Sequence, residues 1–109
     1  MPSSDKFCDR VIGQFKDSGL KVTTRKMMGE YILYADGKIF GGLYDDRLLV
    51  KPVDAAKNLM PEAELQSPYS GAKQMLRVTD ELIDDDEFLV NLVRAMLPEL
   101  PKLAKKRRR

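Results

Sequence analysis

The sequence contains no histidine and a single cysteine, Cys8. A lone cysteine cannot form a disulfide within the chain, and without histidine the usual nitrogen ligand of zinc, iron and copper is missing. Histidine is also the commonest general base in enzymes. We therefore expect no structural metal site, no cofactor and no histidine-dependent catalysis.

Long apolar runs are missing as well. None approaches the roughly 20 residues needed to cross a bilayer, and the first five residues lack the basic and apolar blocks of a secretion signal. We expect a cytoplasmic protein that makes no membrane contact. The length of 109 residues suits one domain, which we predict over residues 1–101, followed by a basic tail, residues 102–109, that we expect to be disordered.

Charge is distributed unevenly along the chain. The last eight residues hold six of the nineteen basic side chains and no acid, which leaves thirteen bases against seventeen acids in the body. The body thus has a formal charge of −4, although the whole chain has +2. An acidic body is a poor general surface for nucleic acid, because nonspecific affinity comes from clustered Lys and Arg. We expect any electrostatic attachment to nucleic acid or to an acidic partner to come mainly from the tail. Its run of basic residues consists of Lys105, Lys106, Arg107, Arg108 and Arg109.

The N-terminal segment has the apolar spacing of an amphipathic helix, which we predict over Asp5–Ser18. Ser4 is a favourable N-cap, and Gly19 supplies a stop. Cys8 lies on the apolar face, so we interpret it as a small buried hydrophobic residue without chemical function.

Two further helices are predicted later in the chain. Pro52 can open a short helix at its first turn, and this helix continues over Asp54–Met60. Asp84 begins a longer helix, because Glu87 stands in the capping-box position and acids favour the positive end of a helix dipole. This last helix should end before Pro98.

Between these helices lie short β-rich segments. Asp36-Gly37 and Asp45-Asp46 separate three of them as two-residue connections, which predicts antiparallel hairpins because parallel strands need crossovers of about a dozen residues. Glu62–Gly71 is predicted to be a loop, and Gln74–Val78 one more strand. The four predicted strands of the meander are Val22–Met28, Glu30–Ala35, Lys38–Tyr44 and Arg47–Lys51.

These elements predict an α+β domain in which one layer of helices packs on an antiparallel sheet, in the order α-β-β-β-β-α-β-α. Gly41-Gly42 lies inside a predicted strand, where glycine is weakening unless a bulge or a closely approaching backbone makes use of the missing side chain. Either a helix or partner crossing at this point or a simple bulge explains the pair.

An ordered set of sequence pieces carries a family resemblance. The pieces are Arg25–Tyr31, Asp36–Phe40, Asp45–Leu48, Lys51 and Pro68–Lys73. Together they resemble the N-terminal domain of the TfoX (Sxy) family, and the likeness covers roughly the whole folded body. Met28 stands where the family usually has phenylalanine, which exchanges one bulky apolar group for another.

The resemblance implies a small domain with no established catalytic residues. In the founding members this domain belongs to a regulator of natural competence that works with a cyclic-AMP-responsive transcription factor, and two-part members carry a second, C-terminal domain. We therefore expect the stand-alone form of the domain: a regulatory or protein-interaction module and not an enzyme. Its expected partner is a protein, such as a component of the transcription machinery, or a second copy of the chain in a homodimer.

Aromatic and basic residues suggest an alternative function. Four tyrosines and three lysines could form a surface of the kind that stacks single-stranded nucleic acid. Partial burial of the rings against the sheet is the simpler interpretation. The alternative is thus a nucleic-acid-associated protein that uses the basic tail and this surface. The tyrosines are Tyr31, Tyr34, Tyr44 and Tyr69, and the candidate binding residues are Arg25, Lys26, Glu30, Tyr31, Lys51, Tyr69 and Lys73.

Carboxylates are the remaining candidates for catalysis. Asp45-Asp46 occupies a predicted turn and Asp84–Glu87 a predicted helix start, and acids are structurally favoured at both places. Glu30 precedes an apolar strand, where a charge must be solvated, paired or functional. We predict that Glu30 pairs with a basic side chain across the meander. The candidates are Arg25, Arg47 and Lys51.

Overall fold

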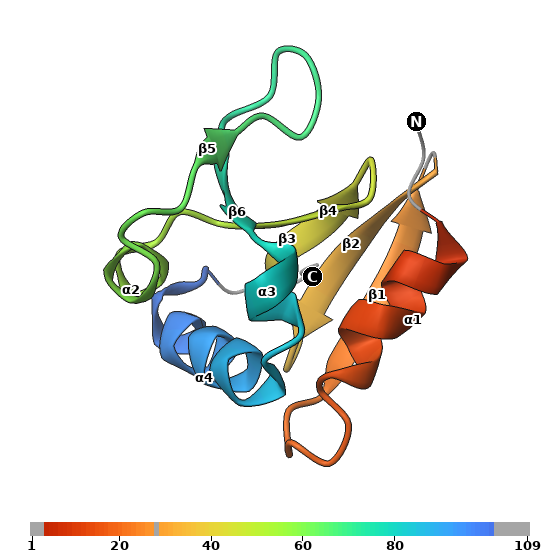
Figure 1. Ribbon diagram of the computed structural model, residues 1–109, viewed down its shortest axis with the longest axis vertical. Coiled ribbons are helices and arrows are strands. Elements are labelled where there is room, and N and C mark those ends of the chain that lie inside the picture. The colour runs from red at the N-terminus through yellow and green to blue at the C-terminus, as the bar shows by residue number, and fades with distance from the viewer. Residues whose placement is uncertain (1–3, 28, 102–109) are drawn as a thin grey trace, which may run out of the picture.

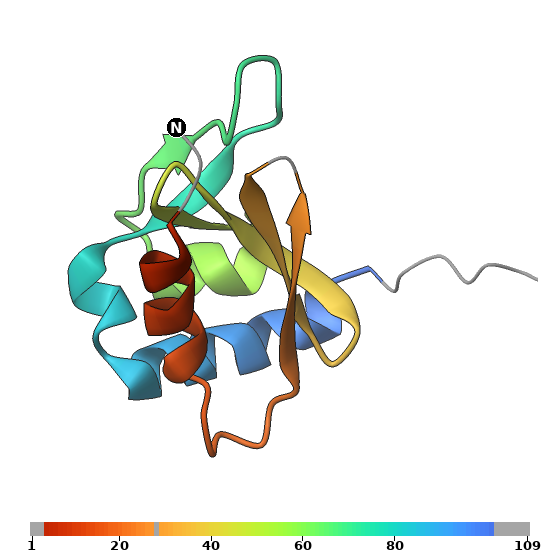
Figure 2. The ribbon, with the colours of Figure 1, turned by 90° about the vertical axis from the view of Figure 1, so that its right-hand side faces the viewer.

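The computed structural model describes residues 4–27 and 29–101 as an antiparallel sheet with helices packed on one side (Figures 1 and 2). The strand order is β1-β2-β3-β4-β6-β5, and every described neighbouring pair is antiparallel. The predicted α+β class and layer arrangement are confirmed. The elements are α1 Asp5–Gly13, β1 Val22–Met27, β2 Glu30–Ala35, β3 Lys38–Tyr44, β4 Arg47–Val50, α2 Asp54–Leu59, β5 Leu65–Gln66, β6 Met75–Val78, α3 Asp80–Ile83, α4 Asp86–Met96 and the 3-10 helix η1 Leu97–Glu99.

Helix α1 begins as predicted and ends early. The hydroxyl of Ser4 accepts the Phe7 N–H at 3.1 Å, which caps the first turn. Beyond Gly13 the chain tightens into three-residue turns, with Lys16 N donating to Gly13 O at 3.3 Å. Asp17 then has a φ of 60°. The expectation that the helix extends to Ser18 was wrong, because these turns intervene before Gly19. Cys8 is buried, as predicted.

Two tight turns fix the meander. Asp36 and Gly37 have φ angles of 51° and 84°, and Asp45 and Asp46 both have 56°. Positive φ at both central residues is the geometry of two-residue hairpins, whose twist matches that of the strands. Strands β2 and β3 have the predicted bounds, and β4 ends one residue before the predicted Lys51.

The segment after β4 differs from the prediction in two ways. Val53 is the N-cap of α2, so Pro52 precedes this helix and does not open it. The predicted loop contains β5, which pairs with β6 through Leu65 opposite Leu76. A two-residue strand has too short an alternation to be recognised in the sequence.

The start of the last helix also differs from the prediction. Thr79 caps a short helix, α3, that the sequence analysis missed, and Asp84 is the C-cap of α3. The N-cap of α4 is Asp85, whose carboxylate accepts the Phe88 N–H at 3.1 Å. Asp84 instead forms an ion pair with Arg10 at 2.9 Å. The capping box predicted for Asp84 and Glu87 was therefore wrong by one residue.

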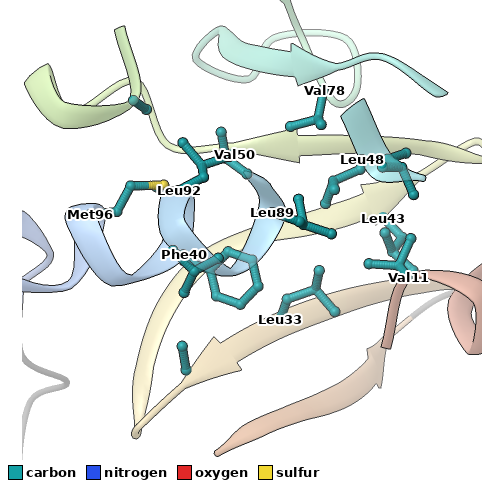
Figure 3. Close-up of a cluster of buried hydrophobic side chains, with 14 of the residues drawn as sticks. Val11, Leu33, Phe40, Leu43, Leu48, Val50, Val78, Leu89, Leu92 and Met96 are labelled. Atoms are coloured by element: carbon teal, nitrogen blue, oxygen red, sulfur yellow. The ribbon is translucent and has the colours of Figure 1, made fainter. Parts of the chain in front are cut away.

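The core fills the space between the sheet and the helices (Figure 3). Phe40 contacts the ring of Phe15 edge to face, with centroids 6.0 Å apart. Burial of such side chains contributes about 1.5–3 kcal/mol each, so this layer dominates stability. Core side chains labelled in Figure 3 include Val11, Leu33, Phe40, Leu43, Leu48, Val50, Val78, Leu89, Leu92 and Met96.

The glycine pair in β3 is explained by close contacts. A Cβ at Gly41 would lie 2.2 Å from the carbonyl oxygen of Leu49 in β4, and a Cβ at Gly42 would lie 2.6 Å from the ring of Tyr44. The β2–β3 register also shifts between Leu33 and Tyr34. The pair thus combines an irregular pairing with close approach, and the approaching groups are a neighbouring strand and a tyrosine ring. None of these groups belongs to a helix, so the expectation of a crossing helix was wrong, whereas a partner crossing at this point stays a prediction.

Two expectations lie outside the described residues: the packing of Met28 and the disorder of residues 102–109. Among the residues that the structure describes, no helix has both the length and the apolar character needed to cross a membrane.

Candidate functional site

The sheet has a second face, turned away from α1, α3 and α4. Successive residues of a strand point to opposite faces, so Tyr31 and Leu33 of β2 are buried in the core while Glu30 and Ile32 lie on the other side, where they are half-buried. This second face is the back of the molecule in Figure 1 and its right side in Figure 2.

Two adjoining hollows of about 460 and 510 Å³ lie on this face. Ile32, Tyr44 and Tyr69 line both of them, and we call the combined surface the tyrosine cleft. Met27 and Glu30 complete the hollow of about 510 Å³. The other hollow extends to the connection between β5 and β6, the long loop at the top of Figure 1. Its wall includes Ile39, Lys51, Pro68, Lys73, Met75 and Pro101.

Tyr44 is the most constrained of the side chains that line both hollows. Its ring lies over Gly42 and meets the ring of Tyr69 edge to face, with centroids 6.4 Å apart and planes at 60°. Burial raises the pKa of the Tyr44 hydroxyl, and the nearby Tyr69 and Glu30 raise it further. The hydroxyl therefore stays neutral near pH 7. Leu49, fully buried but outside the main core cluster, pairs with Gly42 and lines neither hollow.

Arg47 holds one wall of the cleft in place. Its guanidinium donates to Gln66 Oε1 at 2.8 Å, to the Tyr44 carbonyl at 3.1 Å and to the Pro68 carbonyl at 3.4 Å. These bonds join the β3–β4 hairpin to the start of the loop that carries Tyr69. The planar, five-donor guanidinium suits such a junction better than an ammonium group does.

Charge in the cleft is mostly positive. Lys51 and Lys73 line the hollow of about 460 Å³, and no acid among the described residues lines it. Glu30 lines the other hollow, where its Oε1 accepts the Asp45 N–H at 3.2 Å. Glu30 therefore contributes to the β3–β4 turn as well as to the cleft.

The structure divides the predicted binding residues between two faces. Glu30, Lys51, Tyr69 and Lys73 come together in the cleft. Arg25 is exposed on β1 opposite Ile32, so it shares the face of the cleft without lining either hollow.

Tyr31 and Lys26 lie on the helix-covered face instead. The Tyr31 hydroxyl donates to Asp5 of α1, and this hydrogen bond, with burial, raises the pKa of Tyr31 to about 12. Lys26 Nζ lies 5.6 Å from the Tyr31 ring centroid and 3.8 Å from Asp5 Oδ1. The proposed single surface of four tyrosines was therefore wrong, because strand alternation places Tyr31 in the core.

The carboxylates considered for catalysis hold structural positions. Asp46 Oδ1 accepts the Ser4 N–H at 2.7 Å, Asp84 pairs with Arg10, and Asp85 caps α4. Within residues 4–27 and 29–101, no group of three histidine, cysteine, aspartate or glutamate side chains is arranged to bind a metal ion.

Sequence reasoning missed much of the cleft. Ile32, Ile39 and Met75 looked like ordinary strand residues, and Arg47 looked like a partner for Glu30. A usable signal existed in β2, where the alternate residues on the outer face include apolar Ile32 as well as polar ones. An apolar residue on the solvent side of a sheet is a sign of a covered or binding surface.

Comparison with known proteins places the chain in a family context. The pattern described as TfoX N-terminal domain matches residues 14–99. The chain is also similar to a Spirochaeta aurantia protein described as an uncharacterized 12.7 kDa protein in trpE 5'region, with 38% identity over 82 residues that cover 75% of this chain and 70% of the relative. No solved structure matches the chain significantly.

Proposed function

This chain belongs to the TfoX N-terminal domain family, and we propose that it is a non-catalytic regulatory module that acts in the cytoplasm by binding another protein. The observation that carries the proposal is the tyrosine cleft, an open and largely apolar hollow on the sheet face turned away from α1, α3 and α4. Contiguous apolar surface with polar residues at its rim is typical of protein-interaction sites. Tyrosine and methionine are also enriched at interfaces.

The positions of the acidic groups support the non-catalytic part of the proposal. A general acid or base must lie within reach of a substrate in a pocket. Asp45 and Asp46 form a turn and Asp85 caps a helix, so none of these carboxylates lines the cleft. Glu30 does line it, and its carboxylate accepts a turn amide. The cleft is thus better suited to binding through shape and apolar contact than to catalysis.

Capture from native cells tests this function. Tagged full-length protein, Tyr69→Ala and Leu59→Ala would be crosslinked in vivo and purified. Tyr69 is 65% exposed in the cleft, and Leu59 is 43% exposed on α2 outside it, which makes Leu59→Ala a matched control. We expect one partner to be recovered with the wild type and the control and to be reduced with Tyr69→Ala. Recovery of every form only as a free species, under several growth conditions, would contradict the proposal.

Transcription proteins are the first partners to examine, because the founding members of the family carry this domain in a transcription-linked regulator. A second copy of the chain is also a candidate. Sedimentation at several protein concentrations distinguishes a homodimer, because its apparent mass then rises with concentration.

Nucleic-acid association is the second candidate function. It is favoured by the position of the exposed Tyr69 beside Lys73 in the cleft, and by the six bases that follow Pro101 in the sequence. Phosphate contacts lower log affinity by about 0.7–0.9 per neutralised phosphate for each unit of log salt. Binding to DNA or RNA that is absent or insensitive to salt would exclude this function.

A further inference from the structure

We propose that the tyrosine cleft binds a short acidic segment of a partner protein, and that this segment inserts a large apolar side chain between Met27, Ile32 and Tyr69. The inference rests on the proposed function, protein binding, and adds the chemistry of the segment that is bound. Three features of the cleft support it: its exposed apolar lining, the sign of its charge and the restricted access to the ring of Tyr44.

The apolar lining is unusually exposed for this molecule. Four large apolar or aromatic side chains among the described residues are highly exposed, and two of them, Met27 at 45% and Tyr69 at 65%, line the same hollow. Ile32 lines the same hollow and is half-buried. A bound aliphatic or aromatic side chain would remove this surface from water, which is the main source of affinity in such contacts.

The charge of the cleft is opposite to that of the body. Residues 1–101 carry an excess of acids, with thirteen bases against seventeen acids, yet Lys51 and Lys73 line one hollow without an acid among the described residues. Arg25 adds a base on the neighbouring strand of the same face. Complementary charge steers partners and rejects those of like sign, so the cleft favours an acidic segment.

The sequence beyond the cleft has the same sign. Pro101 lines the cleft and is the last described residue, and the eight residues that follow hold six bases and no acid. The same charge argues against the tail itself as the occupant, because Lys51 and Lys73 would repel it.

The arrangement of the rings favours a peptide over single-stranded nucleic acid. Nucleobases need open ring faces on which to stack. The ring of Tyr44 lies over Gly42 and meets Tyr69 edge to face, so it offers little open face. Apart from its two lysines, the remaining wall is mostly aliphatic or proline, including Ile39 and Pro68. Such walls suit the irregular shape of amino-acid side chains.

Fluorescent synthetic peptides test the inference with the full-length protein. The peptides share a central leucine-phenylalanine pair and carry glutamate, glutamine or lysine on both sides. We expect the glutamate peptide to bind about tenfold more tightly than the glutamine peptide, and the lysine peptide to bind weakest. Added salt should reduce the difference between them.

Variants locate the binding site. Tyr69→Ala should weaken binding of the glutamate peptide about tenfold, and Lys51→Glu or Lys73→Glu should each weaken it about threefold. Lys16→Glu, which changes an exposed lysine outside the cleft, and Leu59→Ala should bind as the wild type does. Lys73 is exposed, so Lys73→Glu should fold normally. It therefore tests the site even if circular dichroism shows that Tyr69→Ala is poorly folded.

Three results would overturn the inference. Equal affinity for all flanks would remove the preference for acids, and unchanged binding by Tyr69→Ala and Lys73→Glu would place the peptide elsewhere. Tighter, Tyr69-dependent binding of an oligothymidylate would assign the cleft to nucleic acid. A partner captured in cells through another surface would leave the proposed function standing while the peptide inference failed.

Discussion

Tyr31 shows how one hydrogen bond controls a titration. Its hydroxyl donates to Asp5, and its pKa is raised from the ordinary value of 10.0 to about 12. Between these two pH values the unfolded chain has lost the phenolic proton and the folded chain retains it. The folded state binds more protons, so stability must fall as pH rises through this range and is unaffected below it.

We predict that Tyr31→Phe is slightly less stable than the wild type at pH 7, and that its loss of stability above about pH 10 is smaller. Phenylalanine keeps the ring and removes both the donor and the titration. Tyr44 has a pKa shifted in the same direction, so part of the decline should persist in the variant. Urea denaturation at neutral and high pH measures both effects. Identical pH profiles would show that Tyr31 does not titrate as described.

Gly41 and Gly42 differ in what an added methyl group would meet. At Gly41 the obstacle is the backbone of β4, 2.2 Å from the new atom, whereas at Gly42 it is the movable ring of Tyr44, 2.6 Å away. We predict that Gly41→Ala lowers the free energy of unfolding by about 3 kcal/mol, and that Gly42→Ala lowers it by about 1 kcal/mol. Denaturant unfolding compares the two. Gly42→Ala should also weaken peptide binding, because Tyr44 must shift. Equal losses of stability at the two positions would contradict this account.

At the scale of elements, the cap of α4 provides a direct test of structure against sequence. We predict that Asp85→Ala loses about 1 kcal/mol of stability, because Asp85 caps the Phe88 N–H. Asp84→Ala should lose less than about 0.5 kcal/mol, since its ion pair with Arg10 is largely exposed to solvent. Thermal unfolding of both variants measures the difference. A larger loss for Asp84→Ala than for Asp85→Ala would support the cap at Asp84 that the sequence predicted.

The loop before β6 depends on Arg47. Arg47→Met keeps the apolar stem and removes the hydrogen bonds to the Gln66 side chain and to the Tyr44, Ser67 and Pro68 carbonyls. We predict a loss of about 1–2 kcal/mol in stability and faster amide exchange within residues 67–73, while core amides of β3 stay protected. Hydrogen exchange read by mass spectrometry distinguishes this local effect from general loosening, in which β3 would exchange faster too.

The parts of the fold that the sequence predicted are those with strong local signals. Two-residue turns and alternating apolar residues correctly predicted the first and last residues of β2 and β3. The failures are equally specific. Strand β5 consists of two residues whose place is fixed by pairing with β6, and α3 is a single turn capped by Thr79. Such elements depend on tertiary contacts, which no local pattern contains.

At the scale of the whole molecule, the tail sets the sign of the net charge. Deleting residues 102–109 changes the formal charge from +2 to −4. We predict little change in melting temperature, because the segment offers only Leu103 and Ala104 as apolar groups, and slower association with acidic peptides, because the long-range field reverses. Melting curves and stopped-flow association rates of the two forms check this. A drop in melting temperature of more than a few degrees would show that the tail packs on the body.

The candidate site could be predicted only in part. The sequence named Glu30, Lys51, Tyr69 and Lys73, since charged and aromatic residues are conspicuous in any sequence. It could not separate them from Tyr31 and Lys26, because the choice of face depends on which side of the sheet the helices cover. The apolar part of the cleft was missed for the same reason.

The two faces of the sheet also bear on how this protein can change over time. In β4, Leu48 and Val50 face the main core, and Leu49 between them faces the cleft side. Neighbouring residues of one strand therefore contribute to different faces of the sheet. Substitutions in the loop around Tyr69 alter the cleft wall without touching the packing beneath α4. If the cleft binds a partner as proposed, substitutions in this one loop can change the partner, and selection for a new partner need not work against selection for folding.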